Sequence, residues 1–307
     1  TPAPIWRCDK CSEYHVVESI AELQKLKAKN IPENLHKPWI DEVTFSCKCS
    51  GTMRRIPDVL DVWIDAGCAS WICLYYPQRK DLLTELFPAD FILEAKEQVR
   101  GWFNLLMVTS ILAMDKPSFK NVYMHGMLTD VEGEKMSKSL GNVISPYEFM
   151  EKFGADTLRF YMCRTAAGED INFSWEEAKL KYKNLSILWN VCQYLLDYSK
   201  AAKVDPTKPV KGKLSAEEQA IMSRLHSTIL EVTEAYEKYQ LDRIPALLEE
   251  LFIDLSRVYI QSTRDKIGNE PKVVLSTIYA VLIDFLKMFA TVCPFISEEL
   301  YQLLKAE

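Results

Sequence analysis

The sequence predicts an α/β region followed by an all-α bundle, with a small cysteine-containing segment in front of both. Short apolar runs alternate with helical apolar periods over residues 57–130, as strands and helices of a parallel sheet do. From Trp175 onward, amphipathic stretches repeat apolar residues at i, i+3, i+4 and i+7. Two closely spaced cysteine pairs lie near the N-terminus. We therefore expect three domains, over residues 1–56, 57–174 and 175–307.

The elements expected before residue 130 follow from their patterns. Ser19 and Glu22 form a capping box at the start of the helix "SIAELQKLKAKN". The runs "DVLDVWID" and "ADFILEA" indicate strands that end in polar residues, and "GWFNLLMVTSILAM" indicates a buried helix before the next strand, "NVYMHGML". Ligands of parallel sheets bind beyond the carboxyl ends of the strands, so these polar residues predict a site there.

The bundle begins with a capping signal. Ser174 is followed by Glu177 at the start of a long amphipathic stretch. A connector rich in proline and lysine, "KVDPTKPVKGKLS", then interrupts the pattern. The further helices are expected in "SAEEQAIMSRLHSTILEVTEAYEKY", "RIPALLEELFIDLSRVYIQSTRDKI", "VVLSTIYAVLIDFLKMFATV" and "FISEELYQLLKAE".

Composition places the chain among ordinary globular proteins. Its 307 residues are 48% hydrophobic and 26% charged. No run of eighteen apolar residues occurs, and the start "TPAPIWRCDKCSEYH" lacks the form of a secretory signal, so we expect a cytoplasmic protein. The net charge of -6 argues against bulk attraction to nucleic acid, but it leaves room for a local basic groove.

The cysteine pairs predict a structural zinc site. Cys8 and Cys11 form a C-x2-C pair, and Cys47 and Cys49 form a C-x-C pair. Two such pairs complete the tetrahedral thiolate shell that Zn²⁺ prefers, and the alternative is four unrelated buried cysteines. In the cytoplasm they are not expected to form disulfides. The other cysteines are expected mostly in the core, namely Cys68, Cys73, Cys163, Cys192 and Cys293.

The stretch "GEKMSKSLGN", residues 133–142, has no apolar period and predicts a flexible loop. Lys135 and Lys138 can bring ammonium groups onto a polyanion there, where they would stabilise charge on a transferring phosphate. The alternative from composition alone is a solvated basic turn.

The order of residues in this loop resembles the KMSKS signature of class I aminoacyl-tRNA synthetases, with "LGN" following it as in that family. "EAKEQVRGWF" is similar to the "EGxDQxRGWF" pattern of isoleucyl-tRNA synthetases. Further similar runs, in the family's order, are "PDVLDVWIDAG", "GADTLRFYM", "EDINFSWEE" and "TVCPFISEELYQLL". The resemblance covers essentially the whole chain. It implies the second half of a Rossmann-type nucleotide-binding fold, a zinc-binding insertion remnant and a helical anticodon-binding domain.

The resemblance also implies roles for single residues. Lys138, the second lysine of the signature, contacts the phosphates of ATP during activation, and Lys135 assists it. Glu97 stands where the family has aspartate, so its carboxylate lies one methylene further from the backbone. The residues implied to face the aminoacyl-adenylate, or to line the pocket for a branched apolar side chain, are Glu94, Glu97, Gln98 and Trp102.

The implied activity is that of an isoleucyl-tRNA synthetase, which activates isoleucine with ATP and Mg²⁺ and transfers it to tRNA(Ile). No covalent enzyme nucleophile is needed, so positioning and stabilisation of phosphate charge carry the chemistry. The helical domain would supply a tRNA surface. Basic residues interleave with Tyr182 in "LKYKNL" and with Tyr259 in "SRVYIQSTRDK", as such a surface requires.

A second family signature, His-x-Gly-His, does not occur, because none of the four histidines is followed by x-Gly-His. We therefore expect a fragment or split half of the ligase that supplies the KMSKS half of the site and is inactive alone. A separate chain would then carry the other half. The alternatives are a non-catalytic tRNA- and zinc-binding module or accessory subunit, and a synthetase of the closely related valyl type.

Overall fold

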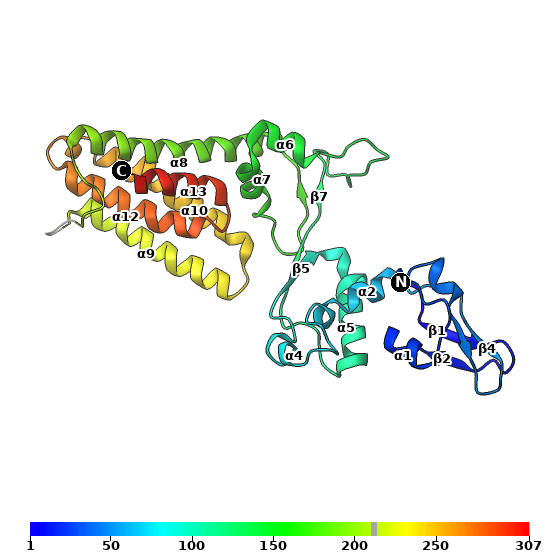
Figure 1. The fold of residues 1–307 in the computed structure, drawn as a ribbon. Coiled ribbons are helices and arrows are strands. Elements are labelled where there is room, and N and C mark those ends of the chain that lie inside the picture. The colour runs from blue at the N-terminus through cyan, green and yellow to red at the C-terminus, as the bar shows by residue number, and fades with distance from the viewer. Residues whose placement is uncertain (210–213, 307) are drawn as a thin grey trace. The chain divides into compact units, whose positions relative to one another are not determined.

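The computed structural model describes residues 1–209 and 214–306. They form two compact units, Thr1–Val122 and Tyr123–Glu307 (Figure 1). Positions 210–213, which belong to the expected connector, lie outside the described residues. None of the described helices is both long enough and apolar enough to cross a membrane.

A small antiparallel sheet with strand order β2-β1-β4-β3 begins the first unit. Its residues alternate between the two faces, so that Trp6, Phe45 and Met53 point into one small core. The indole of Trp6 is 2% exposed, and its Nε1–H donates to the carbonyl of Val43 at 2.8 Å. The strands are β1 (Ile5–Cys8), β2 (Tyr14–Val16), β3 (Thr44–Ser46) and β4 (Thr52–Arg55).

The expected helix after this first hairpin is confirmed as α1 (Ile20–Lys25). The hydroxyl of Ser19 accepts from the backbone N–H of Glu22 at 3.2 Å, as a capping box requires. The carboxylate of Glu22 does not reach back to Ser19. It accepts instead from the N–H of Glu18 at 2.7 Å, so the helix start is held one residue further out.

The run "DVLDVWID" was expected to be a strand, and this prediction is wrong. It forms helix α2 (Val62–Gly67), because the side chain of Asp61 caps the helix by accepting from the N–H of Trp63 at 2.8 Å. A Cβ at Gly67 would lie 2.9 Å from the carbonyl oxygen of Leu105, so the glycine permits close packing between helices. A short apolar run alone does not distinguish a strand from a helix turn.

The rest of the first unit follows the expected strand–helix–strand order. The strand "ADFILEA" and the helix "GWFNLLMVTSILAM" are both confirmed, but the expectation that this helix is buried is wrong on one side, where Leu112 is exposed. Ala89 and Phe119 form a parallel bridge, as the sheet type predicts. These elements are α3 (Ala69–Ile72), α4 (Asp81–Leu86), β5 (Ile92–Ala95), the 3₁₀ turn η2 (Lys96–Arg100), α5 (Trp102–Met114) and β6 (Val122–His125), which starts at the last residue of the unit.

The second unit opens with two short parallel strands, β7 (Leu128–Thr129) and β8 (Ile171–Asn172). The expected strand "NVYMHGML" is therefore broken between β6 and β7. A Cβ at Gly126 would stand 1.7 Å from the carbonyl oxygen of Glu169, so only glycine admits this backbone approach. An aromatic cluster of Phe149, Tyr161, Phe173 and Trp175 fills the space beneath, between helices α6 (Pro146–Phe153) and α7 (Ala155–Met162).

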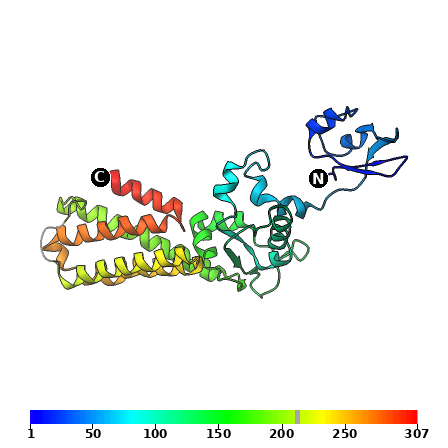
Figure 2. The ribbon, with the colours of Figure 1, turned by 90° about the horizontal axis from the view of Figure 1, so that it is seen from below.

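The predicted helical bundle is confirmed. Its helices run side by side around one apolar core (Figure 1, Figure 2). Ser174 caps the first of them by accepting from the N–H of Glu177 at 3.3 Å. The expected third stretch is not one regular helix, because a π-helical turn interrupts it. The elements are α8 (Trp175–Ala202), α9 (Ala216–Glu237), the 3₁₀ turn η3 (Leu241–Arg243), α10 (Ile244–Asp254), the π turn η4 (Leu255–Tyr259), α11 (Ile260–Ser262), the 3₁₀ turn η5 (Lys266–Gly268), α12 (Pro271–Phe289) and α13 (Pro294–Ala306).

A buried carboxylate network ties α9 to the segment after the π turn. Glu218 is 0% exposed, and its two oxygens lie 2.9 and 2.7 Å from the ammonium of Lys266. The hydroxyl of Tyr259 donates to the same carboxylate at 3.1 Å. Burial raises the pKa of Glu218, but the hydrogen bonds from Lys266 and Ser215 outweigh it and hold the pKa below its ordinary value.

Replacing Lys266 with methionine should therefore lower the free energy of unfolding by about 3–5 kcal/mol, because it leaves Glu218 buried and unpaired. The pKa of Glu218 is lower in the folded chain, so its contribution is present above the unfolded value of about 4.3 and is lost as the pH falls through the folded value. Urea unfolding at pH 7 and at pH 3 checks this. The difference from the parent should shrink at pH 3, while the exposed Lys179→Met control should change little at either pH.

Candidate functional site

Four cysteine sulfurs meet at one end of the small sheet. Cys8 ends β1 and Cys11 lies in the turn that follows, whereas Cys47 and Cys49 lie in the turn before β4. Because β1 and β4 are antiparallel, these two turns stand at the same end. All four sulfurs lie within 4.8 Å of one another. The distance is 3.4 Å from Cys8 to Cys49 and 3.7 Å from Cys11 to Cys47.

These residues fit a zinc ion. Four sulfurs held about 2.3 Å from a tetrahedral Zn²⁺ stand about 3.8 Å apart, close to the spacing of the two nearest pairs. Backbone N–H groups of Cys11 and Lys10 point at the sulfur of Cys8, at 3.5 and 3.4 Å. Chiefly through the Cys11 contact, they lower the pKa of the Cys8 thiol to about 6, which favours the thiolate that a metal requires.

Sequence reasoning missed Gly51, which lies against this cluster. A Cβ at Gly51 would stand 2.7 Å from the sulfur of Cys8 and 2.8 Å from the Cβ of Lys10. The glycine directly after the C-x-C-S run was the available signal, because a second backbone can approach a sulfur cluster closely only where no side chain intervenes. The expectation that most other cysteines are buried holds for Cys192 and Cys293 but is wrong for Cys73 and Cys163, which are exposed.

The residues implied to face the adenylate follow one another along the first unit. Glu94 lies in β5, Glu97 and Gln98 lie in the turn η2, and Trp102 is the first residue of α5. Glu94 and Glu97 present exposed carboxylates there. The side-chain oxygen of Gln98 accepts from the N–H of Trp102 at 2.8 Å, and so caps the start of α5. The indole Nε1–H of Trp102 donates to the carbonyl of Ala66 at 3.1 Å. Gln98 and Trp102 therefore hold this turn in shape, besides any contact with a ligand.

The motifs "PDVLDVWIDAG" and "EAKEQVRGWF" are physically one packing unit. The hydroxyl of Thr109 on α5 donates to the carbonyl of Gly67 at 2.7 Å, which joins α5 to α2. Gly101, inside the second motif, lies close to the side chain that caps α5. A Cβ there would stand 2.5 Å from the oxygen of Gln98 and would displace the cap of α5.

The lysine loop lies in the second unit, and both of its lysines are exposed. Within the part of the chain that the structure describes, neither Lys135 nor Lys138 has an ion-pair partner. Between them, the side chain of Met136 packs against the aromatic cluster. The loop is therefore anchored inward at one side chain, while its two ammonium groups face solvent and are available for an anion.

The loop is more ordered than its composition predicts. One carboxylate oxygen of Asp130 accepts from the N–H groups of Glu132 at 3.0 Å and Glu134 at 2.8 Å. The other accepts from the amide of Asn142 at 2.8 Å, and the amide oxygen of Asn142 accepts from the N–H of Ser137 at 2.9 Å. These bonds, led by the one from Asn142, hold the pKa of Asp130 below its ordinary value. Asp130 and Asn142 were not among the residues predicted from the sequence. The Asp-x-x-Gly turn pattern was the available signal.

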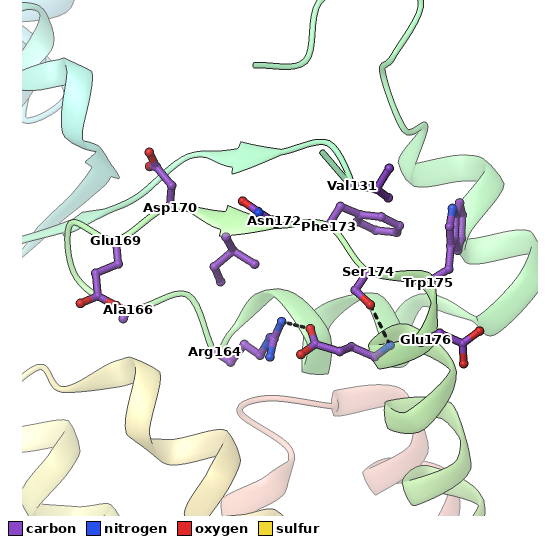
Figure 3. A pocket seen from close by; sticks show the side chains of 12 residues that line it. Val131, Arg164, Ala166, Glu169, Asp170, Asn172, Phe173, Ser174, Trp175 and Glu176 are labelled. Atoms are coloured by element: carbon purple, nitrogen blue, oxygen red, sulfur yellow. Dashed lines mark hydrogen bonds and ion pairs between the residues drawn. The ribbon is translucent and has the colours of Figure 1, made fainter. Parts of the chain in front are cut away.

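A cavity of about 700 Å³ lies beside the lysine loop (Figure 3). Val131, two residues before the lysine loop, is part of its lining. Arg164 is the basic side chain in the lining and is already paired with Glu177. None of the residues implied for ATP or the adenylate lines it, and its carboxylates would repel phosphates, so it is not the triphosphate site. The acidic residues in its lining are Glu169, Asp170, Glu176 and Glu177.

The expected tRNA surface is only partly presented. Tyr259 is 2% exposed and its hydroxyl donates to Glu218, so the prediction that Tyr259 belongs to a tRNA surface is wrong. Lys181 is also turned inward, where it pairs with Glu249. Tyr182 is exposed as expected. An alternation of basic and aromatic residues in the sequence does not show which of these side chains are buried against neighbouring helices.

Taken with the braced lysine loop and the helical bundle, the comparisons with known proteins define the class. The family described as class I tRNA synthetases (I, L, M and V) matches residues 1–174, and the anticodon-binding domain of tRNA ligase matches residues 218–307. The chain belongs to the class I tRNA synthetases.

Among curated proteins, the chain is 43% identical to isoleucine–tRNA ligase of Archaeoglobus fulgidus over 307 residues, which covers 98% of this chain and 30% of that protein. It is 39% identical to the isoleucine–tRNA ligase of Methanocella arvoryzae, covering 98% of this chain and 28% of that protein. The chain thus spans less than a third of the length of the curated relatives it matches.

Solved structures show the same fold. The leucyl-tRNA synthetase of Agrobacterium radiobacter K84, in a ternary complex with tRNA and LeuAMS, matches with a TM-score of 0.72 and 24% identity, over 99% of this chain and 39% of that one. Methionyl-tRNA synthetase of Mycobacterium tuberculosis with methionyl-adenylate matches with a TM-score of 0.69 and 20% identity, over 80% of this chain and 51% of that one. The expected combination of a Rossmann-like region with a helical domain is confirmed.

Proposed function

We propose that this chain is part of an isoleucine–tRNA ligase and supplies the lysine-loop half of its activation site. The observation that carries the proposal is the pair of exposed, unpaired ammonium groups of Lys135 and Lys138, on a braced loop with the KMSKS sequence. The 43% identity to an isoleucine–tRNA ligase favours isoleucine as the amino acid, and therefore tRNA(Ile) as the acceptor, over the valyl alternative.

In the proposed reaction, a carboxylate oxygen of isoleucine attacks the α-phosphorus of ATP. The bond from that phosphorus to the bridging oxygen breaks, and pyrophosphate leaves. Negative charge accumulates on the leaving pyrophosphate, where the ammonium of Lys138 stabilises it and Lys135 assists. Mg²⁺ bound to ATP would neutralise part of the remaining phosphate charge. The adenylate then passes its aminoacyl group to a ribose hydroxyl of tRNA(Ile), and AMP leaves.

The end of β5 and the turn that follows it are assigned the amino acid and its adenylate. Glu94 and Glu97 offer exposed carboxylates to the α-ammonium group of isoleucine, and Gln98 keeps the turn in place. Trp102 supplies an apolar ring beside a branched side chain. Zn²⁺ in the cysteine cluster would be structural.

The proposal requires a second half of the site from outside these residues. The chain contains no His-x-Gly-His run. The α5 helix is apolar on all sides, yet one of its faces is uncovered: Leu112 is 82% exposed, and Val108 and Ile111 on the same face are also exposed. A helix with this pattern is normally buried all round. We assign that face to the segment, or separate chain, that carries the His-x-Gly-His half.

The 307-residue chain alone should therefore show essentially no isoleucine-dependent ATP–pyrophosphate exchange, whereas addition of the His-x-Gly-His half should restore it. Radiolabelled pyrophosphate incorporation measures both. Exchange by the isolated chain at rates of about 1–10 s⁻¹, ordinary for enzymes, would contradict the split site. Absence of exchange in the complemented protein, with tRNA binding intact, would instead favour the non-catalytic tRNA- and zinc-binding module.

A further inference from the structure

We propose that Asp130 and Asn142 are positioning residues for isoleucine activation, because together they form a bracket that fixes where Lys135 and Lys138 leave the backbone. The inference rests on the proposed function of those lysines. The two bracket residues stand at opposite ends of the loop. Their side chains join it into a closed ring through the 2.8 Å bond from the amide of Asn142 to the carboxylate of Asp130.

The bracket holds the backbone at the two places that matter for the lysines. The amide oxygen of Asn142 accepts from the N–H of Ser137, which directly precedes Lys138. The amide group of the same asparagine also lies 3.3 Å from the carbonyl oxygen of Lys135. One side chain therefore contacts the backbone of the first lysine and the residue before the second.

Two further contacts restrict the direction in which the lysine side chains point. Met136 points into the aromatic cluster, and Lys135 forms an antiparallel bridge with Thr129 at the edge of β7. With these neighbours held, the lysine side chains are left on the solvent side. A loop that is already ordered loses less conformational freedom when ATP binds than a flexible loop does. More of the interaction between its lysines and the phosphates is then available to stabilise the transition state.

The bond between the two side chains joins one donor to one acceptor, so the bracket can be tested by swapping the two residues. Asn142→Asp would set two carboxylates against each other at the position of the 2.8 Å bond. Asp130→Asn would set two amide N–H₂ groups against each other, since its oxygen is needed by the N–H groups of Glu132 and Glu134. The double exchange, Asp130→Asn with Asn142→Asp, restores one donor facing one acceptor between the two side chains. It does not restore the contact with the carbonyl of Lys135, because a carboxylate cannot donate to it, so we expect recovery to be incomplete.

The experiment measures ATP–pyrophosphate exchange in the complete ligase that contains this sequence, including its His-x-Gly-His half. Each single variant should lower kcat by about 10²-fold with little change in the KM for isoleucine, the cost expected for a misplacement of about 1 Å. The double exchange should return kcat to within about tenfold of the parent, because a double-mutant cycle isolates the pairwise contact. As a control, Asp205→Asn alters an exposed aspartate that, like Asp130, accepts from a backbone N–H two residues further along, here that of Thr207. This variant should leave kcat unchanged.

Amide hydrogen exchange of the 307-residue chain gives a readout that does not depend on activity. The peptide over residues 133–142 should exchange faster in both single variants and slow again in the double exchange. Faster exchange with an unchanged kcat would overturn the proposal, because the bracket would then order the loop without serving activation. Failure of the double exchange to restore kcat would overturn it as well. If Lys138→Ala also left kcat unchanged, the proposed function itself would fall, and the two failures are thereby distinguished.

Discussion

Replacing Lys138 with alanine in the complete ligase should lower the rate of isoleucine activation by about 10²–10³-fold, the range seen when one preorganised donor to a developing charge is removed. The KM for isoleucine should change little, because the ammonium faces the phosphates and gains most where the pyrophosphate carries its full charge. In free-energy terms, the loss falls on the transition state rather than on binding of the amino acid. Steady-state ATP–pyrophosphate exchange, with ATP and isoleucine varied separately, measures both quantities.

Two further variants make this result specific. Lys138→Arg keeps the charge but replaces a compact ammonium with a planar fork, so it should recover only part of the rate. Lys179→Ala removes an exposed lysine from α8 in the same unit and should leave exchange unchanged. An unchanged rate in Lys138→Ala would return the loop to the alternative of a solvated basic turn.

Much of the fold could be predicted because its signals are local. The cap of α8 by Ser174 and the start of α1 at Ser19 depend on residues three positions apart, and both were found. The period of the bundle helices is local in the same sense. The run "DVLDVWID" shows the limit: its apolar residues suit a strand or a helix turn, and the cap from Asp61 decided for the helix.

The candidate site also contains some residues that the sequence indicated and others that it did not. The spacing of the four cysteines indicated one cluster, and the structure brings their sulfurs together. The two lysines were indicated by the order of residues around them, and their role in activation stays a prediction. The bracket was missed, because Asp130 and Asn142 lie twelve residues apart and meet only when the loop closes. Tyr259 was misplaced for a similar reason. Its partner Glu218 is 41 residues away, and nothing in the residues around Tyr259 shows that a buried carboxylate takes its hydroxyl.

Removing the metal, or one ligand, from the cysteine cluster should unfold the first domain while the bundle stays folded. The small sheet has a core of few side chains, and Cys8 is itself part of that core beside Trp6, Phe45 and Met53. A segment of this size seldom holds together by apolar burial alone. Binding of a structural Zn²⁺ contributes roughly 10–16 kcal/mol in small zinc domains at pH 7, which is more than such a core can supply.

Metal analysis of the chain prepared without chelator should find about one zinc ion per molecule, and Cys8→Ser should abolish it. Hydrogen exchange should then show loss of protection across the four strands β1 to β4, whereas α12, which lies in the other unit, should stay protected. Cys73→Ser alters an exposed thiol of the same unit outside the cluster and should keep both the metal and the protection. Because the thiols must lose their protons to bind, zinc affinity should fall as the pH is lowered. A metal-free chain whose sheet is still protected would show instead that the four sulfurs are packed as ordinary core cysteines.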